Sequence, residues 1–242
     1  MRLALIETGH APEEVVDAHG PFPRLMELML SPHLPDETTF PIYTVVDGTP
    51  PPSPDDADAF LITGSRHGAY EDHDWIPPLC EAIRSIHTAG KPLVGICFGH
   101  QIIAQALGGH VEKYDGGWGL GPTEYPLTDA GRAILGTGDQ QKGPAAITLN
   151  AVHQDQVVTL PPDAVVLAST PFTANAMLAI GESTLTIQPH PEFSCDYVAD
   201  LIAAKPAMGS DAVRATALSK LSEQVDNDLL GQAIAQFITR NR

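Results

Sequence analysis

The sequence has few cysteines, few basic residues and no long apolar run, and each shortage excludes a class of protein. Three cysteines occur among 242 residues (Cys80, Cys97 and Cys195), so we expect no paired disulfide framework. No run of about 18 apolar residues is present, so no transmembrane helix is predicted. The apolar stretch at residues 3–6 is too short, and too soon acidic, for a signal peptide. Together these features predict a cytoplasmic protein.

Positive charge is scarce. Thirteen Lys and Arg residues stand against 30 Asp and Glu residues, which gives a formal net charge of −17. Such a chain repels nucleic-acid phosphates and anionic lipids, so we expect neither nucleic acid nor a membrane as partner. We expect a small-molecule substrate instead. The length suits one large α/β domain, or one domain with an appendage, and such a chain buries a full core without disulfides or metals.

Short apolar runs alternate with helical periodicity in the first half of the chain. Strands are predicted at residues 2–7, 41–47, 59–63 and 92–96, and helices at 25–30, 75–88 and 98–107. This alternation predicts right-handed parallel crossovers and a sheet covered by helices on both faces. Ligands bind at the carboxyl ends of such strands, where the loops after Ile6, Thr63 and Ile96 emerge.

The second half of the chain has a different pattern. A glycine-rich turn is predicted at 116–121, and short strands at 110–113, 123–127, 145–150, 164–168, 176–180 and 185–188. These predict a smaller, partly antiparallel region beside the parallel sheet. From Phe193 onward the pattern is helical, with breaks near residues 206–210 and near Asn227.

Cys97 lies where a predicted strand meets a predicted helix with no loop between them. Gly95 and Gly99 flank it and leave room for a sharp turn, as in the nucleophile elbow that serine hydrolases form. The helix N-terminus favours the thiolate form of this side chain. The alternative is a buried structural cysteine at a tight turn.

His190 is the histidine best placed to act as a base for that thiol. It follows the predicted strand 185–188, and Pro189 and Pro191 restrict the backbone on either side. Glu192 lies two residues on, so in an extended segment its carboxylate points the same way and can orient the imidazole. The alternative is a rigid loop whose histidine makes a structural hydrogen bond.

The segment Gly95-Ile96-Cys97-Phe98-Gly99-His100-Gln101 and the motif His190-Pro191-Glu192 resemble the two signature motifs of class I (triad) glutamine amidotransferases. The resemblance implies a three-layer, flavodoxin-like domain over residues 1–193, with a catalytic triad of Cys97, His190 and Glu192. Residues 194–242 are similar to the C-terminal helical extension of stand-alone, GMP-synthase-like members, packed on the same domain. No cofactor is implied.

Further site residues follow from the elbow and from the resemblance. The N–H of Phe98 is one oxyanion donor by the elbow geometry. The second comes from Gly64 or Ser65, with Ser65 preferred by register, although the family usually has a more glycine-rich turn there. The resemblance implies that Gln101 helps to hold the substrate. It also implies that the stretch containing His153, Gln154 and Asp155 lines a glutamine pocket; a surface turn is the alternative.

These residues predict a cysteine-dependent amidohydrolase that converts glutamine to glutamate and ammonia through a γ-glutamyl thioester. One alternative is a γ-glutamyl peptidase that acts on glutathione-like conjugates. Another is a subunit that is silent alone and docks on a separate synthetase. His67, His73, His100 and His110 lack metal-ligand spacing of the helical His-x3-His kind, so no metal is predicted.

Overall fold

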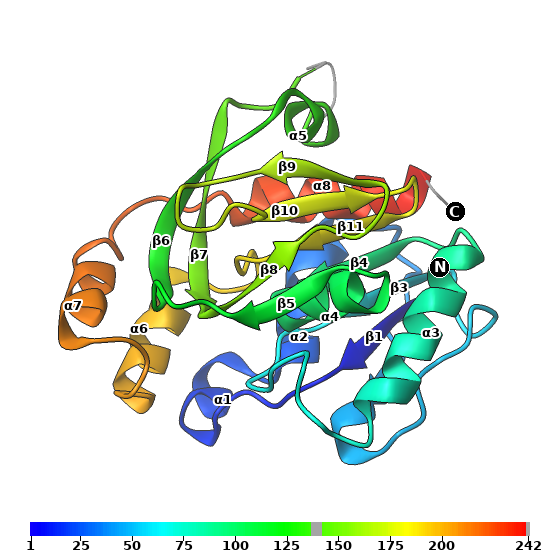
Figure 1. Ribbon diagram of the computed structural model, residues 1–242, viewed down its shortest axis with the longest axis horizontal. Coiled ribbons are helices and arrows are strands. Elements are labelled where there is room, and N and C mark those ends of the chain that lie inside the picture. The colour runs from blue at the N-terminus through cyan, green and yellow to red at the C-terminus, as the bar shows by residue number, and fades with distance from the viewer. Residues whose placement is uncertain (137–141, 241–242) are drawn as a thin grey trace.

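The computed structural model describes residues 1–136 and 142–240, and a seven-stranded sheet of order β2-β1-β3-β4-β11-β10-β9 lies at its centre (Figure 1). Pairing is parallel from β2 to β11 and antiparallel for β10 and β9. The strands are β1 (Leu3–Glu7), β2 (Ile42–Thr44), β3 (Ala59–Ile62), β4 (Leu93–Ile96), β9 (Ala164–Ala168), β10 (Met177–Ile180) and β11 (Thr184–Ile187). The predicted, mostly parallel α/β sheet is confirmed.

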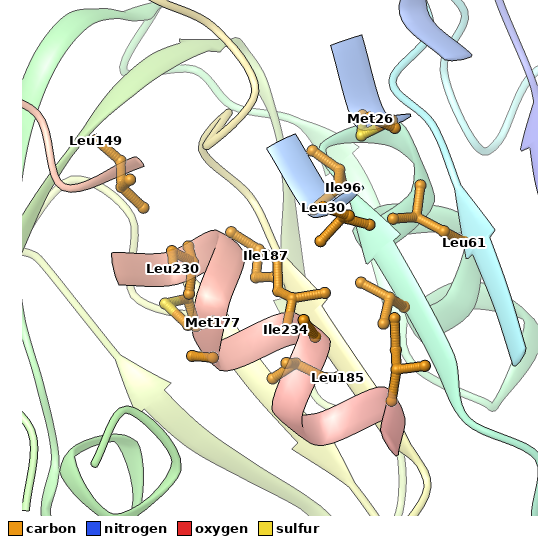
Figure 2. Close-up of a cluster of buried hydrophobic side chains, with 14 of the residues drawn as sticks. Met26, Leu30, Leu61, Ile96, Leu149, Met177, Leu185, Ile187, Leu230 and Ile234 are labelled. Atoms are coloured by element: carbon orange, nitrogen blue, oxygen red, sulfur yellow. The ribbon is translucent and has the colours of Figure 1, made fainter. Parts of the chain in front are cut away.

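Helices cover both faces of this sheet, because successive residues of a strand point to opposite faces and both sets are apolar. In β1, Leu3 and Leu5 join the core beneath α2 (Phe22–Leu30) and α8 (Asn227–Arg240). Ala4 and Ile6 join the core beneath α3 (Ile76–Thr88) and α4 (Phe98–Ala106). Figure 2 shows Leu230 and Ile234 of α8 among the side chains of β10 and β11.

Two antiparallel pairs stand beside the main sheet, as the pattern of the second half predicts. β5 (His110–Lys113) pairs with β8 (Asp155–Thr159), and β6 (Gly119–Pro126) pairs with β7 (Ala146–His153). The β6–β7 pair rises at the left of Figure 1 and reaches α5 (Asp129–Ile134). An isolated bridge between Asn150 and His190 ties β7 to the segment that follows β11.

Some predicted element bounds are wrong. The strand predicted at 41–47 ends at Thr44, because its partner β1 ends at Glu7, and Val45–Asp47 forms a 3-10 turn. The turn predicted at 116–121 overlaps β6. Gly121 has φ +80°, and a Cβ there would lie 2.8 Å from the Ala217 Cβ, so this glycine permits close packing rather than a turn. Helix α1 (Glu13–His19), helix α5 and strand β8 were not predicted.

Within the described residues, three helices follow Phe193, where the sequence predicts two or three: α6 (Cys195–Ala204), α7 (Asp211–Ser219) and α8. Tyr197 and Leu201 of α6 share a buried cluster with Val15 of α1 and Phe22 of α2, while α8 joins the core beneath the sheet. We therefore keep, as a proposal, the division into residues 1–193 and an extension, 194–242, packed on the same body. Among the described helices, none is both long and apolar enough to cross a bilayer.

Candidate active site

Cys97 is the residue at which β4 turns directly into α4. Its backbone has φ 52° and ψ −102°, a conformation that side-chain-bearing residues rarely adopt and that costs about 1–3 kcal/mol. The turn is held in place because the Cys97 N–H donates to the Ile187 carbonyl of β11 at 2.8 Å. The predicted strand-to-helix junction at Cys97 is confirmed. The Cys97 thiol lies 3.9 Å from the Val152 carbonyl oxygen in β7.

His190 reaches Cys97 because β11 is the parallel neighbour of β4, with Ile187 opposite Ile96. Because the two strands are parallel, the segments that follow β4 and β11 leave the sheet at the same edge. The His190 N–H donates to the Asn150 carbonyl at 2.8 Å, which fixes the backbone. The His190 ring stacks on Phe193, with centroids 4.1 Å apart and planes 3° from parallel. The imidazole therefore has one available orientation.

The Glu192 carboxylate pairs with this imidazole. Its Oε1 lies 2.7 Å from His190 Nδ1, and both side chains are almost fully buried. Burial disfavours the imidazolium, but the charges of Glu192 and Cys97 and the hydrogen bonds to both outweigh it, so the pKa of His190 lies well above its ordinary value. A protonated His190 beside Cys97 favours the thiolate, which is the nucleophilic form.

The turn after β3 lies opposite these two residues. A Cβ on Gly64 would be 3.2 Å from His190 Cε1 and 3.8 Å from Cys97 Cβ, so the Gly64 backbone passes directly across the site. The Gly64 carbonyl accepts the hydroxyl of Thr8 at 3.2 Å. Since a trans peptide directs its C=O and N–H to opposite sides, the Ser65 N–H points away from Thr8. As the first residue of α4, Phe98 likewise has an N–H without an acceptor inside the helix.

The side chains of Gln101, Gln154 and Asp155, which are predicted to bind substrate, make contacts within the protein. The Gln101 amide donates to the Asp155 carbonyl at 2.9 Å and to Gln188 Oε1 at 3.1 Å, which joins α4 to β8. The Gln154 amide donates to the Tyr114 carbonyl at 3.3 Å. The Asp155 carboxylate is half-buried; burial raises its pKa, while a hydrogen bond from Tyr70 opposes the shift. The Gln101 side chain thus connects α4 to β8 and to Gln188. The Asp155 carboxylate is hydrogen-bonded by Tyr70, which lies in the turn after β3.

His153 lies in the interior beside His190. Burial and the neighbouring His190 lower its pKa to about 3, against a smaller opposing contribution from the Asp155 backbone. Neither ring nitrogen meets hydrogen-bond geometry, and a Cβ on Gly119 would lie 3.0 Å from Nε2. His153 is therefore neutral at ordinary pH, and it lies within the β6–β7 pair rather than at a surface turn.

Sequence reasoning missed several residues that shape the site. Asn150 holds the His190 backbone and donates its side-chain amide to the Phe193 carbonyl at 2.9 Å. Phe193 itself stacks between His190 and Tyr197, and the second stack has centroids 4.0 Å apart. The aromatic pair at i and i+4 after the His-Pro-Glu motif was the available signal. Tyr125 of β6, which has no sequence signature, lies close enough to feel the charge of Cys97.

Known proteins resemble this chain in sequence and in fold. The "Glutamine amidotransferase class-I" sequence profile matches residues 53–200. Gamma-glutamyl peptidase 3 of Arabidopsis thaliana is 33% identical over 163 residues, which make up 66% of this chain and 66% of that protein. Gamma-glutamyl peptidase 4 of the same plant is 36% identical over 66% of this chain and 64% of its own length. The match thus spans about two thirds of these relatives.

A solved structure extends the comparison to nearly the whole fold. The crystal structure of a glutamine amidotransferase from Thermotoga maritima superposes with a TM-score of 0.74, covers 98% of both chains and is 18% identical. At that identity the likeness concerns the fold alone. The sequence profile covers more than half of the chain, and its boundaries include Cys97, His190 and Glu192. The chain therefore belongs to the class-I glutamine amidotransferase family, whose members are cysteine-dependent hydrolases.

Proposed function

We propose that the chain hydrolyses the γ-carboxamide of glutamine through a thioester on Cys97. The observation that carries this proposal is the strained, buried Cys97 beside an imidazole that Glu192 holds at 2.7 Å. In the first half-reaction the Cys97 thiolate attacks the amide carbon. The N–H groups of Phe98 and Ser65 stabilise the resulting oxyanion. His190 then gives its proton to the departing ammonia, and the C–N bond breaks.

The second half-reaction returns the enzyme to its starting state. His190, now neutral, takes a proton from a water molecule that attacks the thioester carbon. Glutamate leaves as the C–S bond breaks, and the Cys97 thiolate and His190 imidazolium are restored. We further propose that the backbone around His153, Gln154 and Asp155 lines the pocket for the glutamine amino and carboxylate groups. In this scheme Gln101 holds that segment in place.

The direct experiment measures ammonia and glutamate released from glutamine by the purified chain. Equal amounts of both products are expected, because hydrolysis releases one of each. Incubation with a glutamine-analogue diazoketone, followed by peptide mass spectrometry, is expected to label Cys97 and neither Cys80 nor Cys195. An absence of both turnover and Cys97 labelling would contradict the proposed nucleophile. Labelling without turnover would favour a different γ-glutamyl substrate, or a synthetase partner that must dock first.

Replacement of Glu192 by glutamine is expected to shift the pH profile of this site. The amide keeps the shape but removes the negative charge that raises the pKa of His190. The imidazolium then loses its proton at lower pH, so the pH interval in which His190 can act as an acid ends at lower pH. The high-pH limb of the kcat/KM profile should therefore move to lower pH. We expect kcat/KM to fall by as much as about 10⁴-fold, by analogy with the loss of an orienting carboxylate in serine proteases.

Glu112→Gln is a matched control for that experiment. Glu112 also pairs with a histidine, His110, at 3.7 Å, but both side chains are exposed on β5. An unchanged profile is expected for this variant. A Glu192→Gln enzyme with the wild-type profile would mean that the carboxylate does not tune His190.

A cavity lined in part by Tyr125 and Ala151 favours a second candidate, the γ-glutamyl peptidase. The cavity has a volume of about 370 Å³ and is lined by side chains of β6, β7, α7 and residues 170–173. Tyr125 lines the cavity and lies close enough to Cys97 to interact with its charge. Ala151, which also lines the cavity, is adjacent in sequence to Val152, whose carbonyl oxygen lies 3.9 Å from the Cys97 thiol. The lining carries no charged side chain: it combines aromatic rings, small aliphatic side chains such as Leu120 and Val213, and the hydroxyl groups of four threonines, Thr123, Thr170, Thr173 and Thr216. Ammonia needs no such space, whereas an uncharged substituent on the γ-glutamyl nitrogen would fit it.

Ala212→Phe tests whether this cavity holds a leaving group. Ala212 is exposed on α7 and lines the cavity, so a phenyl group would fill part of it without disturbing the core. We expect kcat/KM for a γ-glutamyl anilide to fall about tenfold or more, as for a blocked hydrophobic subsite, while hydrolysis of glutamine is unchanged. Ala215→Phe, on the same helix, exposed and outside the cavity, is the matched control. Equal effects of both variants on both substrates would exclude this role for the cavity.

A further inference from the structure

The turn between β3 and α3 carries a cluster of ligand-type side chains outside the triad. His67 Nδ1 lies 3.3 Å from Glu71 Oε2, and His73 Nε2 lies 2.8 Å from the same oxygen. The three atoms all lie within 4.8 Å of one another. Within residues 1–136 and 142–240, this is the one set of three such side chains that converges in this way. The catalytic mechanism uses none of them.

We propose that His67, Glu71 and His73 form a binding site for a divalent transition-metal ion of the zinc class. Zinc binds histidine nitrogen and carboxylate oxygen at about 2.0–2.2 Å, so tetrahedral ligand atoms lie about 3.3 Å apart. The His67 separation of 3.3 Å from Glu71 Oε2 equals that value, and the His73 separation of 2.8 Å is shorter, so a small side-chain rotation of His73 would bring it into range. Two imidazoles and one carboxylate leave a fourth position for water.

The surroundings suit a metal ligand set. The three side chains are partly exposed, by 19% for His67, 43% for Glu71 and 35% for His73, so an ion can enter from solvent. Trp75 packs against both imidazoles. Its ring stacks on His73 with centroids 5.8 Å apart, and it makes a T-shaped contact with His67 at the same centroid distance.

The cluster is connected to both proposed oxyanion donors. The His67 N–H donates to Ser65 Oγ at 3.1 Å, directly beside the proposed Ser65 donor. On the other side, the Trp75 ring packs on Phe98, with centroids 5.6 Å apart. A bound ion would cross-link residues 67, 71 and 73 and so restrict the turn that carries Ser65. The ion binding rests on the cluster alone; only this effect on the turn rests on the proposed function.

The test uses the Cys97→Ala chain, because a thiolate beside His190 could itself bind zinc. Zn²⁺ is titrated by calorimetry and Co²⁺ by visible absorption. We expect one saturable site, and a cobalt spectrum typical of nitrogen and oxygen ligands without thiolate charge-transfer bands. Either His67→Ala or His73→Ala should weaken binding by at least about tenfold, since even residues that only support metal ligands have effects of that size. Zn²⁺ should also raise the Tm of the Cys97→Ala chain, but not that of the His67→Ala/His73→Ala variant of it.

His110→Ala is the matched control, because His110 is exposed, pairs with Glu112 and lies on β5 outside the cluster. It should leave zinc affinity unchanged. The proposal is overturned by an absence of saturable binding, by binding that survives His67→Ala/His73→Ala, or by thiolate bands that assign the ion to Cys80 or Cys195. In each of those cases the two histidines serve only as hydrogen-bond partners of Glu71. Since the Cys97→Ala chain is expected to be inert, none of these outcomes bears on the proposed hydrolysis.

Discussion

Replacement of Cys97 by alanine is expected to lower turnover of every γ-glutamyl substrate by at least about 10⁴-fold, because in the proposed mechanism the thiolate forms the covalent intermediate. The chain should remain folded. Cys97 is buried but small, and alanine can occupy the same strained backbone with the Ile187 hydrogen bond intact. Ammonia release measures the first effect, and circular dichroism with thermal unfolding measures the second.

Cys80→Ala is the matched control for this variant. Cys80 is a partly buried cysteine on α3, and burial raises the pKa of its thiol, which keeps it protonated and unreactive. Turnover should persist in the Cys80 variant. Wild-type turnover in the folded Cys97→Ala chain would disprove the covalent mechanism, because no other cysteine is paired with a histidine and a carboxylate in the described part of the chain.

Replacement of Gly99 by alanine is expected to destabilise the fold by about 3 kcal/mol. A Cβ at this position would lie 2.3 Å from the carbonyl oxygen and 3.0 Å from the carbonyl carbon of Ile62. Both are backbone atoms of a central strand, so neither can move away cheaply. The first turn of α4 would have to lift off β3, and it would carry the Phe98 N–H with it. Denaturant unfolding should show a lower midpoint, and kcat should fall in the fraction that still folds.

The comparison for this variant is Gly90→Ala. Gly90 has φ +69°, and no atom lies within 4 Å of the position that an added methyl group would take, so alanine there adds only left-handed backbone strain of about 1–2 kcal/mol. A Gly99→Ala chain no less stable than Gly90→Ala would show that α4 and β3 have room to separate. The strand-to-helix turn would then not require glycine at position 99, contrary to what the close contact with the Ile62 backbone indicates.

The central strands and the His190–Glu192 contact are the parts that the sequence predicted well. β4 and β11 are buried on both faces, so they appear as continuous apolar runs, and each is followed at once by its signature motif. The Cys97 junction and the His190–Glu192 contact follow from those local patterns. Helix α1 was missed because only Val15 of its seven residues is buried, which leaves almost no apolar periodicity.

The features that sequence could not predict depend on distant parts of the chain. The cavity lined by Tyr125 and Ala151 needs β6, β7 and α7 together, and its threonines and aromatic residues have no common spacing. β7 continues through Asn150 and His153 to its end, although both are polar, because both are buried inside the fold. His67, Glu71 and His73 converge through a turn rather than along a helix, so spacing rules for helical metal sites do not find them.

The pairing of β4 with β11 has a consequence for how the enzyme matures. Leu93 pairs with Thr184, and the whole β5–β10 region lies between these strands in sequence. Closing so long a loop is entropically costly and slow, so this contact belongs among the late events of folding. In the proposed mechanism, a nascent chain that has released only its first half has the nucleophile but not the base. We therefore expect the reactivity that His190 confers on Cys97 to appear only after β11 has paired with β4.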